Sequence, residues 1–252
     1  MRSILVSCCS ESLAIGFPLI RRLLSQNYMV HVVDTAKGCR QLMDWAMGLN
    51  GMNAKRRMRF VVYNPDLVGD FDFQIRQCMR DNGSICVINF NKATSPEIEL
   101  SFFNEGMYID INNSDSRVGK GIHLKTAPIL LGRSEVTPTD WSCLQTRNKM
   151  GQPVAVTCIM DVVDIISNFI LINPLSLQNS KVVPIFCRNF FDYSEYPGIP
   201  IDWLTSVSDQ NKDSTNIDIE RMNSVCQSLF KFTPSSIEEA LVECPTRRPR
   251  GS

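Results

Sequence analysis

Apolar and polar positions follow two different periods along the first part of the chain. Four short runs rich in β-branched residues are typical of buried strands, and the stretches between them repeat apolar residues at helical spacing. The expected strands cover 3–7, 28–34, 59–64 and 84–90, and the expected helices cover 15–26, 38–52 and 71–82. Strands that alternate with helices in this way form a parallel sheet with helices on both faces. The predicted fold class is therefore α/β, a Rossmann-like doubly wound parallel sheet with a small C-terminal lobe.

The domain organisation follows from the length and from the position of these elements. A chain of 252 residues with 44% hydrophobic content can bury the core of one large α/β domain. We expect a single Rossmann-like domain over 1–245, with a nucleotide-binding core over 1–135 and a substrate-binding lobe over 136–245. The basic, proline-containing end over 246–252 is expected to be a flexible tail.

Candidate ligand-binding residues follow the ends of the strands, because ligands of such sheets bind outside the carboxyl ends. Asp34 ends the second strand, where a carboxylate can accept hydrogen bonds from both ribose hydroxyls of NAD and repel a 2′-phosphate. Alternatively, Asp34 only caps the helix that follows. The full candidate cofactor-binding set is Ser7, Cys8, Ser10, Ile15, Gly16, Asp34, Asp66, Leu67, Asn89 and Phe90.

The turn after the first strand contains few glycines for a dinucleotide site. Such a turn needs residues without a Cβ so that the backbone can approach a pyrophosphate, and here only Gly16 qualifies. Glu11 also brings a negative charge to the turn. We therefore predict that NAD binding is weakened. Gly16 has a second interpretation, in which it only allows the first helix to pack closely on its strand. Asp66 also has a second interpretation, in which it belongs to a solvent-exposed turn and binds no ligand.

Three segments, in the same order along the chain, carry a resemblance to a known family. They are ILVSCCSESLAIGFPLIRRLLSQNYMVHVVD at 4–34, QPVAVTCIMDVVDIISNFILINPL at 152–175 and DIERMNSVCQSLFKFTPSSIEEALVE at 218–243. Together they resemble the extended short-chain dehydrogenases/reductases, the NAD-dependent epimerase/dehydratase group. The resemblance implies a Rossmann-like fold, an NAD or NADP cofactor, and a catalytic tyrosine with a lysine four residues later.

The departures from this family bear most on function. No tyrosine of the chain is followed by a lysine four residues later, and the segment between the fourth strand and 152 is short. That segment offers one short helix over 96–106 and a strand over 107–113, which leaves no room for the active-site helix. We assign no catalytic residue and expect a non-catalytic binding or scaffold protein. The alternatives are an NAD(P)-dependent oxidoreductase or epimerase with an atypical active site, and a methyltransferase that uses S-adenosylmethionine.

Charge and cysteine content narrow the possible partners. Twenty-six basic and 26 acidic residues balance, so nothing requires nucleic acid or an anionic membrane. The ten cysteines are scattered without a C-x-x-C motif and only two histidines are present, so no metal site is predicted. Reduced thiols and the absence of a long apolar run favour the cytoplasm, with a mitochondrial presequence as the alternative. The expected partners are a nucleotide and either a protein partner or a second copy of the chain.

Overall fold

The computed structural model describes residues 2–49, 54–90, 107–111, 122–126, 129–130, 155–172, 181–188 and 219–243. The first part of the chain alternates strands and helices as expected, with shifted ends. Its elements are β1 (Ser3–Ser7), the 3₁₀ helix η1 (Cys9–Ser12), α1 (Leu13–Ser25), β2 (Met29–Asp34), α2 (Ala36–Met47), α3 (Ala54–Arg57), β3 (Met58–Val62), α4 (Asp70–Asn82) and β4 (Ser84–Asn89). The elements that follow are β5 (Met107–Ile111), β6 (Ile122–Thr126), β7 (Ile129–Leu130), β8 (Thr157–Cys158), α7 (Ile159–Ile172), β9 (Lys181–Ile185), α8 (Ile219–Phe230) and α9 (Ile237–Glu243).

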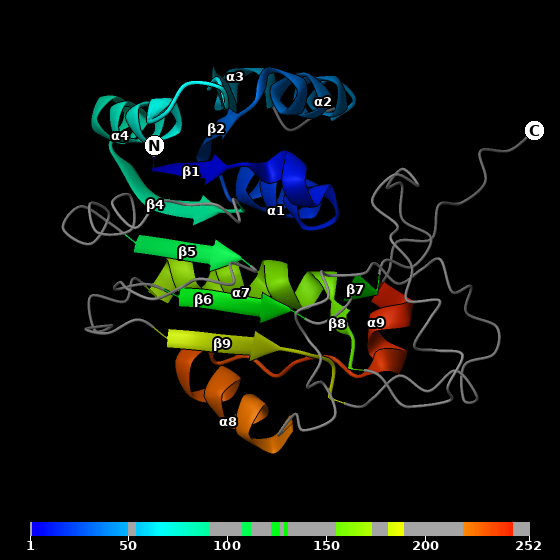
Figure 1. The fold of residues 1–252 in the computed structure, drawn as a ribbon. Helices are drawn as coiled ribbons and strands as arrows, with labels where there is room; N and C mark the ends of the chain where they lie inside the picture. The colour runs from blue at the N-terminus through cyan, green and yellow to red at the C-terminus, as the bar shows by residue number, and fades with distance from the viewer. Residues whose placement is uncertain are drawn as a thin grey trace, which may run out of the picture. The chain divides into compact units, whose positions relative to one another are not determined.

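Seven strands form one sheet in the order β3-β2-β1-β4-β5-β6-β9, and β7 pairs with β8. The pairings from β3 through β6 are all parallel. Figure 1 shows β1, β4 and β5 side by side, with their arrowheads at the same end. The chain leaves β3 at one edge and returns to β4 beside β1, and a ligand crevice forms at such a reversal of strand order. The predicted Rossmann-like fold is confirmed.

Local sequence explains where the first helices begin and end. On α1, Ile15, Leu19 and Leu23 are fully buried, as their helical spacing predicts. The side chain of Thr35 accepts a hydrogen bond from the backbone N–H of Gly38 and so caps the start of α2. Left-handed glycines, Gly69 and Gly83, flank α4 at its two ends.

The chain divides into two compact units, Met1–Leu124 with Ile166–Val182, and Lys125–Ile165 with Val183–Ser252. In the second unit, the carboxylate of Asp161 accepts hydrogen bonds from the backbone N–H and the hydroxyl of Ser235, at 2.8 and 2.7 Å. All candidate ligand residues belong to the first unit. The predicted short helix over 96–106 and the tail over 246–252 lie outside the described residues, and the predicted limits of core and lobe remain predictions.

Candidate functional site

The β1–α1 turn adopts a compact form in which Cys8 takes the place expected for a glycine. Cys8 has φ 52° and ψ 36°, a left-handed conformation that glycine adopts with less strain. Its N–H donates to the carbonyl of Val33, 2.8 Å away, and its Sγ lies 3.5 Å from the hydroxyl of Tyr63. Glu11, which sequence analysis flagged as unfavourable for a pyrophosphate, has an exposed side chain. The turn is therefore tied to β2 and to the residue after β3.

The carboxylate of Asp34 is the centre of the site, and the protein itself supplies hydrogen bonds to both of its oxygens. Oδ2 accepts from the backbone N–H of Ser10 at 2.9 Å, while Oδ1 accepts from the hydroxyl of Ser10 at 2.7 Å and from the N–H of Thr35 at 2.8 Å. Asp34 is only 1% exposed. The predicted ribose-binding group thus holds the β1–α1 turn against the end of β2.

The close approach of α2 supports this arrangement through Gly38. A Cβ at this position would overlap Oδ1 of Asp34 and would lie 2.5 Å from the hydroxyl oxygen of Ser10. Real Cβ atoms do not tolerate such contacts, so a side chain at position 38 would displace the Asp34–Ser10 pair. Thr35, which caps α2, also donates its N–H to Asp34. The interpretation of Asp34 as the cap of α2 is wrong, because Thr35 caps this helix and the carboxylate of Asp34 instead binds the N–H of Thr35 and the β1–α1 turn. Its role as a ligand group stays a prediction.

Gly16 makes room for the side chain of Cys9. A Cβ on Gly16 would overlap Sγ of Cys9 and approach the carbonyl oxygen of Cys9 to 3.2 Å. Cys9 is fully buried, and burial raises the pKa of its thiol well above its usual value, with a further rise from the nearby charge of Asp34. The thiol therefore remains protonated and unreactive at neutral pH. In this structure, Gly16 serves the packing of η1 on α1.

The other predicted residues differ in accessibility. Ile15 is fully buried on α1 and Phe90 is 2% exposed, with its N–H donating to the carbonyl of Ser7 at 3.0 Å. Asp66 is exposed, and Leu67 is 59% exposed in the turn between β3 and α4. The predicted set therefore divides into a group around the β1–α1 turn, which is buried apart from the half-buried Ser10, and an exposed pair after β3.

A row of buried polar side chains crosses four neighbouring strands beside this turn. Ser7, Asn89, Asp110 and His123 are in register on β1, β4, β5 and β6, and none is more than 3% exposed. The hydroxyl of Ser7 donates to Oδ1 of Asn89 at 2.7 Å, and Nδ2 of Asn89 donates to Oδ1 of Asp110 at 3.1 Å. Oδ2 of Asp110 lies 3.4 Å from Nδ1 of His123.

Asn89 is the branch point of this polar row, because its Nδ2 also lies 3.1 Å from the hydroxyl of Tyr108. Two predicted ligand residues, Ser7 and Asn89, therefore bond to each other and to the sheet. Sequence analysis missed Asp110 and Tyr108. The available signal was a lone acidic residue inside an otherwise apolar strand. A satisfied buried network of this kind rigidifies the sheet and specifies its register.

Tyr63, whose hydroxyl lies 3.5 Å from Sγ of Cys8 in the turn, is poorly suited to acid–base chemistry. Burial raises its pKa far above the usual value, and its interaction with Cys8 raises it further. No group of histidine, cysteine or acidic residues suited to a metal ion occurs within the described ranges. Over the same ranges, no helix is both long enough and apolar enough to cross a membrane.

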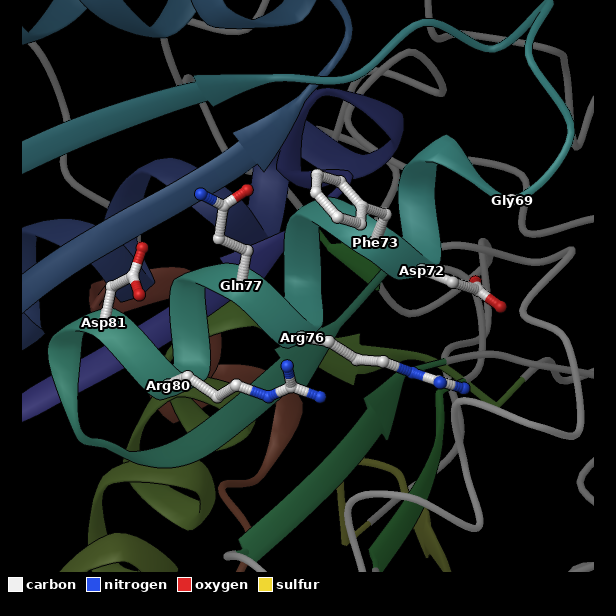
Figure 2. A pocket seen from close by; sticks show the side chains of 7 residues that line it. All are labelled: Gly69, Asp72, Phe73, Arg76, Gln77, Arg80 and Asp81. Carbon is white, nitrogen blue, oxygen red and sulfur yellow. The ribbon is translucent and has the colours of Figure 1, made fainter.

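A separate pocket of about 510 Å³ lies along α4 rather than at the ends of β1 and β2. Figure 2 shows the side chains of Arg76 and Arg80 extending from one side of this helix, while Phe73 and Gln77 project from another. Gly69, Asp72 and Asp81 complete the lining. The pocket contains none of the predicted cofactor-binding residues.

Several solved structures share this fold. No protein-family model and no curated protein matches the sequence. The structure is similar to Gre2 from Candida albicans, with a TM-score of 0.60, 9% identity and coverage of 96% of this chain and 97% of that one. It is also similar to dTDP-glucose 4,6-dehydratase from Bacillus anthracis in complex with NAD, with a TM-score of 0.58, 13% identity and coverage of 97% and 95%.

A third similar structure is UDP-glucuronic acid 4-epimerase from Bacillus cereus in complex with UDP-glucuronic acid and NAD, with a TM-score of 0.56 and 12% identity over 95% and 96% of the two chains. These neighbours are extended short-chain dehydrogenases/reductases of the epimerase/dehydratase group. The predicted resemblance is thus confirmed for the fold, and it extends over nearly the whole length of the chain.

Proposed function

We propose that this protein is a non-catalytic Rossmann module derived from the epimerase/dehydratase group, with a weakened NAD site, and that it acts as a binding or scaffold protein. The proposal rests on the hydrogen bonds that Asp34 already makes within the protein. Both carboxylate oxygens accept hydrogen bonds from the protein's own β1–α1 turn and from the start of α2.

A ribose must compete with these internal partners. A hydrogen bond to a charged group contributes about 1.5–3 kcal/mol net, so a ribose hydroxyl that replaces the Ser10 hydroxyl on Asp34 only exchanges one such bond for another. The affinity that a free carboxylate provides is then lost, which corresponds to about a tenfold to hundredfold weaker Kd. The side chain of Cys9 fills the space beside Gly16, and this also opposes a close approach of a pyrophosphate to the turn.

The absence of a catalytic pair supports the non-catalytic part of the proposal. The sequence contains no tyrosine with a lysine four residues later. Tyr63, whose hydroxyl lies 3.5 Å from Sγ of Cys8, has a raised pKa that disfavours proton transfer at neutral pH. Ser7, Asn89 and Asp110 use their polar groups within the sheet, so they contribute to the core instead of to a reacting centre.

A thermal-shift titration tests the proposal. The purified chain is titrated with NAD, NADH, NADP, NADPH and S-adenosylmethionine, because a ligand that binds only the folded state raises Tm by mass action. We expect a shift only at millimolar NAD or NADH, its loss in Asp34→Ala, and a larger shift in Ser10→Ala, which removes one of the two hydrogen bonds that Oδ1 of Asp34 accepts.

The control is Ser25→Ala, which removes an exposed hydroxyl bonded to the carbonyl of Arg22 and leaves the site unchanged. Saturation at micromolar NAD in the unaltered chain would contradict a weakened site. Turnover of a nucleotide sugar with NAD would instead establish the oxidoreductase or epimerase alternative.

A further inference from the structure

The pocket along α4 has the size of a small-molecule site. Its volume is about 510 Å³, and pockets for small ligands typically measure about 300–1,000 Å³. Two rows of side chains border it, each with a spacing of four residues along the helix (Figure 2). One row consists of Asp72, Arg76 and Arg80, and the other consists of Phe73, Gln77 and Asp81. None of these side chains belongs to the buried face of α4.

The two arginines of this pocket have no partner in the protein. Within the described ranges, no hydrogen bond or ion pair engages the guanidinium group of Arg76 or Arg80. The Nε of Arg76 is also buried, and it too lacks a hydrogen-bond partner there. A buried donor without a partner is costly, and a bound water, ion or ligand is its usual explanation. Because both side chains extend from the same side of the helix, one anion can contact both (Figure 2).

The chemistry of the lining favours a phosphate monoester. One guanidinium group satisfies a carboxylate, whereas a dianionic phosphate can accept hydrogen bonds from two. The ring of Phe73, which is 61% exposed on the other row, offers an apolar surface to the group that carries the phosphate. Asp72 lies one turn before Arg76, and Asp81 directly follows Arg80. These carboxylates repel additional negative charges, so a chain of phosphates fits poorly.

We propose that the pocket along α4 binds a small phosphate monoester, with the phosphate held by Arg76 and Arg80 and a planar apolar body against Phe73. The pocket shares no residue with the β1–α1 turn or with Asp34. The proposal therefore goes beyond the function proposed above and does not depend on the state of the NAD site.

Titrations followed by the amide spectrum of the ¹⁵N-labelled full chain test this site. The probes are phenyl phosphate, inorganic phosphate, phenol and tripolyphosphate. We expect phenyl phosphate to saturate with a Kd at or below about 1 mM and to shift amide signals of α4. Inorganic phosphate should bind about threefold to tenfold more weakly, because it lacks the ring that contacts Phe73. Phenol should show no saturation, and tripolyphosphate should bind no more tightly than inorganic phosphate.

Four variants identify the groups that hold the ligand. Arg76→Gln and Arg80→Gln should each raise the Kd of phenyl phosphate at least about tenfold. Phe73→Ala should remove the advantage of phenyl phosphate over inorganic phosphate. Arg21→Gln is the matched control, because it removes an exposed arginine of α1 outside the pocket and should leave the Kd unchanged. Amide signals outside α4 that keep their positions show that each variant is folded.

Failure of phenyl phosphate to saturate below about 10 mM would overturn the proposal. An equal loss of affinity in Arg21→Gln would do the same, since it would reduce the binding to general charge attraction. Phenol or tripolyphosphate that binds as tightly as phenyl phosphate would also contradict it. A phosphotyrosine peptide carries the same chemical group, and binding more than about tenfold tighter than phenyl phosphate would overturn the assignment to a small molecule in favour of a protein partner.

Discussion

Gly16→Ala tests whether the glycine of the turn serves packing, as the structure indicates. The added Cβ would overlap Sγ of the fully buried Cys9 and approach the carbonyl oxygen of Cys9 to 3.2 Å. The side chain of Cys9 must therefore move within a close-packed core. We expect Gly16→Ala to destabilise the fold, although alanine is the better helix former within α1.

The magnitude follows from two opposing contributions. Overpacking a core costs about 1–3 kcal/mol, and exchanging glycine for alanine inside a helix returns up to about 1 kcal/mol. The expected net loss is about 1–2 kcal/mol in the free energy of unfolding, or about 2–8 °C in Tm for a chain of this size. Cys9→Ala removes the overlapping Sγ, so in the double variant the two effects should be coupled by about 1–2 kcal/mol.

Circular dichroism during urea unfolding gives the free energy of unfolding of the unaltered chain, the two single variants Gly16→Ala and Cys9→Ala, and the double variant. Gly48→Ala is the control, because its Cβ would meet only the carbonyl of Trp45, at 3.3 Å, at the end of α2. Gly16→Ala at or above the stability of the unaltered chain would refute the packing account. Additive effects of Gly16→Ala and Cys9→Ala would refute the assignment of Cys9 as the group that Gly16 accommodates.

Three further predictions concern the same unit. Cys8→Gly should destabilise the fold by about 1 kcal/mol, seen as a lower urea midpoint, because the loss of the buried side chain and of its contact with the Tyr63 hydroxyl costs more than glycine recovers by relieving the left-handed conformation at φ 52°. Asn89→Ala should cost about 2–4 kcal/mol in the same assay, because it leaves Ser7 and Asp110 without their shared partner. Burial, followed by the charge of Asp34, raises the pKa of the Cys39 thiol from 9.0 to about 11. The unfolded thiol then loses its proton before the folded one, so Cys39 should lower the stability by about 2 kcal/mol as pH rises from about 9 to about 11. The difference in Tm between the unaltered chain and Cys39→Ala isolates this effect from the other buried thiols, and a difference that stays constant over this window would contradict it.

The strands and helices of the first unit were predictable because their apolar periods are strong. The strands over 3–7 and 84–90 have β-branched, almost wholly apolar sequences, and the structure places β1 and β4 there. The four-residue helix α3 was not expected, because Ala54–Arg57 contains no apolar period that a pattern could detect. Helix ends shifted because caps such as Thr35 depend on local backbone geometry.

The candidate site was predictable in position but not in detail. The sequence placed Asp34 at the end of the second strand, and the structure has it at the end of β2, at the carboxyl edge of the sheet. The hydrogen bonds from Ser10 to Asp34 depend on the path of the turn. The left-handed conformation of Cys8 sets this path, and no sequence pattern predicts that conformation. The polar row through Asp110 depends on strand register across β4 and β5, a tertiary property that a single sequence does not reveal.

The affinity of the unaltered chain for NADH tests the central claim most directly. The fluorescence of bound NADH is followed as ligand is added to the purified protein, with Asp34→Ala measured in parallel. The account predicts no saturation below about 1 mM, because the β1–α1 turn already occupies the carboxylate of Asp34. A saturable signal with Kd in the low micromolar range that Asp34→Ala abolishes would contradict it and would identify an intact dinucleotide site.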